Sequence, residues 1–497
     1  MASLCAILII HKRPSDPGSP KGRVFGEMKL FGLLAALACV AVSTAQPATR
    51  PDPVSPEVRA AAEAPALEWL KGNVVPFAVD VPTQAELKPL MESLQGARVI
   101  GFGEATHGDQ QSQLFKTHAI RELVRLGQID SLMLEVNRRP GAELDAYVNE
   151  GKGDLAQLML ESGIFSIWRT DEFASLIVWL RAYVTRTGKS IRIYGIDCQE
   201  PGLDFKFALD WLEKADKETA QKISTILQPM VGAEIESAHY FTWVKTQTKD
   251  DYARYHNAGN SLVAEIKKHT NTPGQEEALY AAQVGVQGLE TYELEFTKAD
   301  VVPTMDNIVY FARRDVFMGA NLLRRLGGGK AALWAHDMHT VGEIPEAIQQ
   351  FGFRTVGGEV RRALKEEYVA IGFAWATGSF RARLFSATDQ VVDAAERPFE
   401  IFALSNMRPG DLGEFFSRVG PHRWYADFRK ANEPTKAWGK LLYYRGWCGW
   451  GVDPKAWMSN PMQDAGPPFP THDILVFHHT IGPSTTWMLP AHPSRSN

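Results

Sequence analysis

Short apolar runs alternate with amphipathic stretches along much of the chain. Four runs stand out: Arg98–Phe102, Ser131–Leu134, Ser190–Ile196 and Ala331–Ala335. Runs of this length suit buried strands, and the stretches between them have the apolar spacing of helices. Strands that alternate with helices are typical of βα units. The pattern therefore predicts an α/β fold, with a mainly parallel central sheet flanked by helices.

The rest of the chain contains further candidate elements. A short helical segment is expected over Ala66–Leu94. Additional strand candidates follow the fourth run, and they are Arg354–Val356, Tyr368–Phe373, Trp424–Phe428 and Ile474–Phe477. The segment Tyr443–Pro470 is rich in Trp, Gly and Pro, which predicts a long loop region.

A long helical tract separates the third and fourth strands. It covers Phe205–Gly327, and three consecutive glycines from Gly327 onward break the helix before the next strand. We expect this tract to be a helical insertion, residues 205–327, packed over the sheet. Residues 66–204 then form the first part of the α/β core, and residues 328–497 form the second part.

The N-terminus has the features of a secretory signal peptide. Residues 28–45 begin with Met28 and Lys29, continue as an apolar run and end in small residues up to Ala45. This run is short for a membrane span, and its end suits signal peptidase. Residues 1–27 are then interpreted as an extension upstream of the true start. Residues 46–65 are expected to form a flexible leader. We expect an exported protein, periplasmic or secreted, with no membrane span after cleavage.

Composition and charge exclude some classes of protein. Hydrophobic residues make up 45% of the chain and charged residues 22%, which is ordinary for a globular protein. The net charge is −5, and no basic tract interleaved with aromatic residues occurs, so a nucleic-acid partner is not expected.

Two of the four cysteines, Cys198 and Cys448, remain after the expected cleavage. In an exported protein they could form a disulfide or stay as two separate buried thiols, and their spacing does not decide between these. No Cys-x-x-Cys pair occurs, so a structural zinc site is not expected.

Four of the predicted strands end in titratable residues. Glu104 and His107 follow the first strand, Glu135 the second, Asp197 the third, and His336 and His339 the fourth; together these six residues are the candidate site. Ligands of open parallel sheets bind outside the carboxyl ends of the strands. A single strand that ends in a titratable residue is explained by an ordinary turn or cap. Four strands with this ending predict that the side chains converge on one site.

Clusters of Glu and His suit the activation of water. A carboxylate beside an imidazole fixes its tautomer and raises its basicity, so that the histidine can take a proton from water near neutral pH. Lys116 could stabilise a developing oxyanion, although its spacing alone is more typical of a solvated helix residue.

Two alternatives to this chemistry are a covalent nucleophile and a metal ion. No G-x-S-x-G elbow occurs, and Gly446–Gly451 (GWCGWG), which resembles one loosely, is interpreted as a Gly/aromatic loop. The spacings Glu104-x-x-His107 and His336-x-x-His339, together with Glu135, could hold a divalent metal ion.

Several motifs resemble the erythromycin esterase family. They are GFGEATHG (101–108), LEVN (134–137), GIDCQ (195–199) and WAHDMH (334–339), with RRDVFMGAN (313–321) ahead of the last. They occur in that family's order, and the likeness extends from about Leu94 to His479. The resemblance implies a hydrolase that needs no cofactor and opens a small-molecule ester by direct attack of activated water.

The resemblance also implies roles for individual residues. Glu104, His107, Glu135 and His336 match the family's catalytic positions: His107 as the general base, the two glutamates orienting that base and the water, and His336 polarising the substrate. The supporting positions implied by the motifs are Lys116, Asp197, Gln199 and His339. Asp337 departs from the family, which often has Asn there, and this difference makes metal capture more plausible. A metal-dependent hydrolase and a non-catalytic binding protein are therefore the alternatives.

Overall fold

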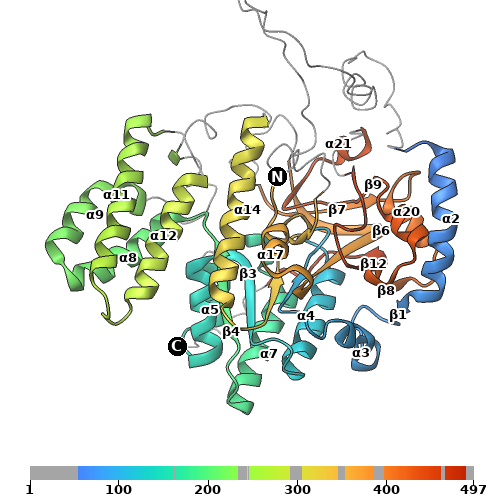
Figure 1. Ribbon diagram of the computed structural model, residues 1–497, viewed down its shortest axis with the longest axis horizontal. Coiled ribbons are helices and arrows are strands. Elements are labelled where there is room, and N and C mark those ends of the chain that lie inside the picture. Colours follow the sequence, from blue (N-terminus) through green and yellow to red (C-terminus); the bar gives the residue numbers. More distant parts are fainter. Residues whose placement is uncertain are drawn as a thin grey trace, which may run out of the picture.

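The computed structural model describes residues 54–161, 164–232, 243–244, 246–291, 305–344, 353–385, 397–459 and 465–487. Its centre is a mixed, mostly parallel β-sheet flanked by helices (Figure 1). The strands follow the order β1-β8-β12-β6-β2-β5-β3-β4, and β7 and β10 also pair with β6. Their bounds are β1 Val75–Pro76, β2 Val99–Phe102, β3 Ser131–Asn137, β4 Arg192–Asp197, β5 Ala331–Trp334, β6 Tyr368–Leu384, β7 Glu400–Ser405, β8 Arg423–Asp427, β10 Gly451–Val452 and β12 Ile474–Ile481. The α/β fold with a mainly parallel sheet, predicted from the pattern of apolar runs, is confirmed.

The strands that lead to the candidate site are parallel neighbours. Phe102 of β2 and Leu134 of β3 both pair with Trp334 of the strand between them, β5. Asn137, at the end of β3, pairs with Asp197, at the end of β4. Because the strands run in the same direction, their carboxyl ends meet at one edge of the sheet. Antiparallel pairs lie elsewhere: β1 with β8, β8 with β12, and β7 with β6.

Both faces of the central strands are buried. Along β5, Ala332 and Trp334 belong to one apolar cluster, whereas Ala331 and Leu333 belong to another. This alternation follows from the two-residue period of a strand. The first cluster is covered by helices α4, Gln110–Arg125, and α7, Asp171–Thr187, and the second by helices α14, Met305–Leu326, and α17, Val356–Leu364.

Several helices begin and end with sequence-encoded caps. The side chain of Asp109 accepts a hydrogen bond from the backbone N–H of Ser112 at the start of α4, and Thr170 does the same for Phe173 at the start of α7. Helix α7 ends at Gly188, which has the left-handed backbone that glycine tolerates best. The remaining longer helices are α2 Pro56–Asn73, α3 Gln84–Ser93, α5 Arg138–Glu150, α8 Pro201–Ala215, α9 Lys217–Val231, α11 Lys249–Lys268 and α12 Gln275–Thr291. The shorter ones are α6 Leu155–Glu161, α15 Asp337–Thr340, α19 Leu412–Ser417, α20 Glu433–Gly439 and α21 Pro454–Ser459.

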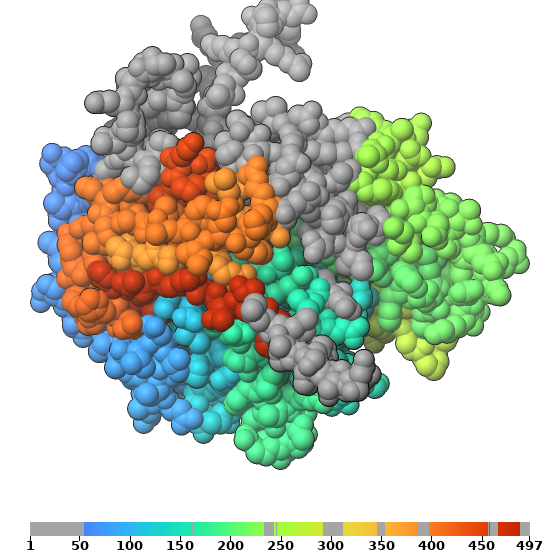
Figure 2. All heavy atoms as spheres, turned by 180° about the vertical axis from the view of Figure 1, so that it is seen from behind, coloured from blue at the N-terminus to red at the C-terminus, as the bar shows by residue number. Residues whose placement is uncertain are grey.

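Helices α8, α9, α11 and α12 pack against one another around an apolar core of their own. They form a lobe at the side of the molecule, drawn in green in Figures 1 and 2. The division of the chain into domains stays a prediction. No helix in the described part of the chain is long and apolar enough to cross a membrane.

Three local predictions are wrong. The segment Arg354–Val356 is not a strand, because the Thr355 hydroxyl accepts from the N–H of Gly358 and caps helix α17. The helix expected over Ala66–Leu94 is two helices, α2 and α3, with β1 between them. Helix α2 already begins at Pro56, within the segment expected to be a leader, because Ser55 caps it and proline suits the first turn.

Candidate active site

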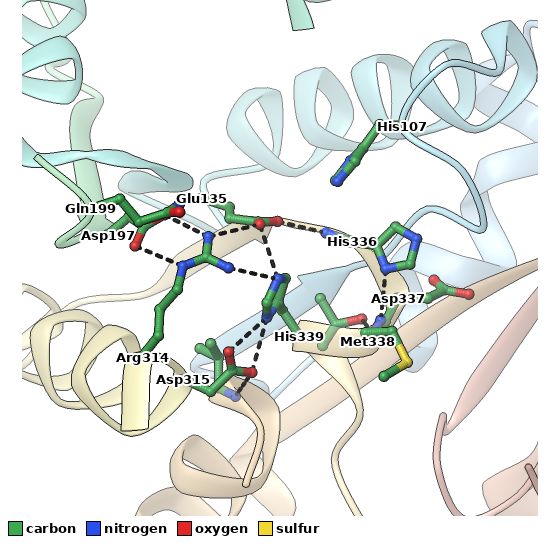
Figure 3. A network of polar contacts seen from close by, with 12 residues as sticks. His107, Glu135, Asp197, Gln199, Arg314, Asp315, His336, Asp337, Met338 and His339 are labelled. Atoms are coloured by element: carbon green, nitrogen blue, oxygen red, sulfur yellow. Dashed lines mark hydrogen bonds and ion pairs between the residues drawn. The ribbon is translucent and has the colours of Figure 1, made fainter. Parts of the chain in front are cut away.

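The candidate site lies where β2, β5, β3 and β4 end (Figure 3). Glu135 and Asp197 belong to the last residues of β3 and β4, although the sequence had placed them just beyond the strands. His107 lies in the loop after β2, and His336 directly follows β5. The sequence-predicted residues therefore come from four neighbouring strands and lie together at one edge of the sheet.

Glu104 orients the ring of His107. Nδ1 of His107 lies 2.5 Å from Oε1 of Glu104, and the indole N–H of Trp168 donates to the same oxygen at 2.9 Å. Lys116 donates to the other oxygen of Glu104, and its Nζ lies 3.9 Å from the centre of the Trp334 ring. Burial alone would raise the pKa of Glu104, but Lys116 and His107 outweigh it and hold the pKa below its ordinary value.

A carboxylate that accepts from Nδ1 requires the proton on that nitrogen, so Nε2 of the neutral ring carries the basic lone pair. Among the described residues, Nε2 of His107 has no hydrogen-bond partner. Figure 3 shows the ring of His107 pointing toward the space between Glu135 and His336. The rings of His107 and His336 are 4.9 Å apart between centroids.

The contacts of His336 favour the other tautomer, with the proton on Nε2 and the lone pair on Nδ1. Its Nδ1 accepts from the backbone N–H of Met338 at 3.2 Å, and its Nε2 lies 3.3 Å from the carbonyl oxygen of Cys448. Both contacts are satisfied when the proton is on Nε2. Burial, together with the nearby ring of His107, lowers the pKa of His336 to about 3. His336 is therefore a neutral hydrogen-bond donor and not a cation at neutral pH.

Glu135 is held by donors on both oxygens. The backbone N–H of His336 donates to Oε2 at 3.0 Å, and on Oε1 the guanidinium of Arg314 lies at 3.1 Å and Nε2 of His339 at 3.0 Å. Arg314 also forms a bidentate pair with Asp197, at 2.6 and 3.0 Å. Nδ1 of His339 lies 2.9 Å from both oxygens of Asp315.

These partners determine which side chains of the buried network are charged. Burial would raise the pKa of Glu135, but His339 and Arg314 hold it well below its ordinary value. Glu135 is therefore ionised and is poorly suited to take up a proton. Burial alone would lower the pKa of His339, yet Asp315 and Glu135 raise it to about 10, so His339 is an imidazolium between two carboxylates.

The sequence indicated most of these positions but not all of them. Lys116 and Asp197 are fully buried in the network, and the amide N–H of Gln199 donates to Asp197 at 2.7 Å. Arg314 and Asp315, from helix α14, were not expected as site residues. The signal available in the sequence was the place of the motif RRDVFMGAN directly ahead of the last site motif.

The residues proposed as metal ligands are engaged in other contacts. Both nitrogens of His339 face carboxylates, Nδ1 of His336 accepts from backbone, and Nδ1 of His107 faces Glu104. Among the described residues, no group of three or more His, Cys, Asp or Glu side chains is placed to hold one metal ion. Asp337 accepts from the backbone of Phe373 and from an indole, so it does not extend a ligand set. The described residues of the site do not fit a metal centre.

The two cysteines do not form a disulfide. Cys198 is buried with its Sγ 3.6 Å from the hydroxyl of Thr291, and Cys448 lies in the loop that contacts His336. Burial raises the pKa of Cys198 far above its ordinary value, so this thiol is inert as a nucleophile.

The charge on His339 makes the stability of the fold depend on pH. Its pKa is about 10 in the folded protein and about 6.5 in an unfolded chain. The stabilisation is therefore complete below about pH 6.5 and is lost as the pH rises toward 10. We expect the melting temperature of the wild type to fall more steeply between pH 7 and 10 than that of His339→Gln. Thermal unfolding of both proteins across this range measures the difference, and parallel curves would contradict it.

Comparison with known proteins finds a matching family model and related sequences. The sequence model of the erythromycin esterase family matches residues 128–456. Putative hydrolase YbfO of Bacillus subtilis is 23% identical over 346 residues, which cover 66% of this chain and 76% of that protein. Erythromycin esterase type I of Escherichia coli is 26% identical over 113 residues, 22% of this chain and 27% of that protein.

Solved structures share the fold. A Bacillus cereus protein superposes with a TM-score of 0.70 at 20% identity and covers 85% of this chain and 99% of its own. A mutant erythromycin esterase in its open conformation superposes with a TM-score of 0.62 at 16% identity, covering 82% and 97%. At these identities the likeness concerns the fold alone.

Proposed function

Because the chain belongs to the erythromycin esterase family of hydrolases, we propose that it opens a small-molecule ester or lactone by direct attack of water. One observation carries the proposal. Glu104 engages Nδ1 of His107, and this leaves the Nε2 lone pair directed into the space between Glu135 and His336. A base with its tautomer fixed and its lone pair available is what general-base catalysis on water requires.

The reaction follows from this geometry. Nε2 of His107 takes a proton from water while the water oxygen forms a bond to the carbonyl carbon of the substrate. The carbonyl oxygen becomes an oxyanion and accepts a hydrogen bond from the Nε2–H of His336. The bond to the alcohol oxygen then breaks, and that oxygen takes the proton from Nε2 of His107. The products are an acid and an alcohol, or one hydroxy acid from a lactone.

The remaining residues hold this arrangement in place. Glu135 accepts a hydrogen bond from the attacking water, because its low pKa keeps it ionised and each carboxylate oxygen can accept more than one donor. Lys116 and Trp168 keep Glu104 fixed, so the ring of His107 does not rotate away from the water. None of these steps uses a metal ion or another cofactor.

The proposal includes export. It rests on the signal-peptide pattern of residues 28–45, which lie outside the described residues. An enzyme made in this way meets its substrate in the periplasm or the medium.

The experiment that tests the proposed function is a survey of hydrolysis. Protein is purified from the periplasm or medium, and we expect its N-terminus to be Gln46. It is then assayed against p-nitrophenyl esters, simple lactones and macrolactones, with and without EDTA. We expect turnover of at least one ester or lactone at a rate that EDTA does not change. Activity that is lost to EDTA and restored by one divalent metal would favour a metal-dependent hydrolase, and tight binding without turnover would favour a binding protein.

A further inference from the structure

The loop of residues 445–448, here called the Cys448 loop, connects the two histidine segments of the site. The backbone N–H of Cys448 donates to the carbonyl oxygen of Ala105 at 2.7 Å, and Thr106 and Cys448 form a parallel β-bridge. The carbonyl of the same residue lies 3.3 Å from Nε2 of His336. One residue of the loop therefore touches both the segment that carries His107 and the ring of His336.

The contact with the Cys448 carbonyl determines the state of His336. A carbonyl oxygen only accepts hydrogen bonds, so the proton of the imidazole must be on Nε2. The backbone N–H of Met338 only donates, so it requires the lone pair on Nδ1. Together these two backbone groups select the neutral Nε2–H tautomer and direct its N–H toward the carbonyl oxygen of Cys448.

Two anchors hold the Cys448 loop in this position. The indole N–H of Trp447 donates to Oδ2 of Asp337 at 2.9 Å, and the guanidinium of Arg445 lies 4.6 Å from the centre of the Trp447 ring. The indole N–H of Trp375 donates to the carbonyl oxygen of Gly446 at 3.1 Å. A side chain at Gly446 would meet the amide nitrogen of Asn406 at 1.9 Å from its Cβ, so this residue must be glycine for the loop to lie here.

We propose that the Cys448 loop is a positioning element of the active site. Its Cys448 carbonyl holds His336 in the Nε2–H tautomer while the site is empty, and the substrate's oxyanion replaces that carbonyl as the acceptor during the reaction. Trp447 is the positioning residue that anchors the loop to Asp337, next to His336 in the chain. This role rests on the proposed function of His336 as the donor to the oxyanion.

The wild-type protein tests the tautomer without any variant. In protein labelled with ¹⁵N at histidine, the ring nitrogens of His336 are assigned by comparison with His336→Gln. We expect a protonated Nε2 and an unprotonated Nδ1 from pH 5 to 9. A protonated Nδ1 in this range would overturn the proposal, even if every loop variant failed to fold.

A pair of matched variants tests the anchor. Trp447→Phe removes the indole N–H that binds Asp337. Trp450→Phe makes the same change three residues later, where the ring packs against Phe385 at 5.5 Å and the indole donates no hydrogen bond to a described residue. With p-nitrophenyl acetate, we expect Trp447→Phe to lower kcat between about 10- and 100-fold with little change in KM, because His336 is displaced in the transition state. The His336 signals should then show both tautomers, and Trp450→Phe should match the wild type.

The outcomes of these experiments distinguish a failure of the positioning role from a failure of the proposed ester hydrolysis. Unchanged kcat and unchanged His336 signals in folded Trp447→Phe would overturn the positioning role. An equal loss of kcat in both variants would do so as well, since the effect would then be one of general packing. If the expected tautomer and its loss in Trp447→Phe are seen but the wild type hydrolyses no ester, the positioning stands and the proposed function fails.

Discussion

His107→Asn is expected to lower kcat/KM by about 100- to 10,000-fold, which is the usual contribution of a general base. The amide N–H of asparagine takes the place of Nδ1–H and still donates to Glu104, so the carboxylate keeps a partner. The variant has no atom with the basicity of Nε2 to take the proton from water. The measurement is kcat/KM for the best ester of the survey, with circular dichroism to confirm folding.

His422→Asn is the matched control for this change. His422 is exposed, its ring lies 5.0 Å from that of His479, and neither belongs to the site. We expect this control to retain wild-type kcat/KM. A His107→Asn protein that keeps more than about a tenth of the activity would contradict the role of His107 as the base.

Arg314→Met is expected to destabilise the fold by about 3–5 kcal/mol, the cost of removing one partner from a buried ion pair. Arg314 is buried and donates to Glu135 and Asp197. Its loss leaves Asp197 without its bidentate cation and Glu135 with His339 as its remaining cationic partner. The pKa of Glu135 should rise as a result, and catalysis should weaken because Glu135 loses one of the donors that fix its position. Denaturant unfolding measures the loss of stability.

Two further proteins make this test specific. Arg254→Met removes an exposed arginine that pairs with Asp251, and its effect on unfolding should be small. Arg314→Met combined with Asp197→Asn removes the negative charge of the carboxylate that has lost its bidentate partner, and we expect it to be more stable than Arg314→Met alone. An Arg314→Met protein as stable as the wild type would show that the buried network is not held by this guanidinium.

The sequence predicted the central sheet because its strands are short, buried on both faces and separated by helices. The four strand endings were enough to bring Glu104, Glu135, Asp197 and His336 together, since parallel strands share one edge. Their convergence in space follows from topology and needs no knowledge of side-chain packing.

The parts that the sequence did not predict depend on contacts between distant segments. Arg314 lies in a helix far along the chain from Glu135, and an arginine in an amphipathic helix looks like a solvated residue until the helix is placed. The Cys448 loop was correctly interpreted as a loop, but its contact with His336 depends on the path between β6 and β10. Arg354–Val356 has the pattern of a strand because its apolar end, Val356, is the first residue of a helix that Thr355 caps.

The central claim is that water attacks the substrate directly, and hydroxylamine partitioning tests it most directly. Several esters that share one acyl group but differ in their alcohol are hydrolysed in the presence of hydroxylamine, and the ratio of hydroxamate to acid is measured for each. Direct attack predicts that any hydroxamate forms in a ratio that changes with the alcohol, because the alcohol is still bonded when the nucleophile arrives. A single ratio for all of the esters would reveal a common acyl-enzyme and would contradict the account.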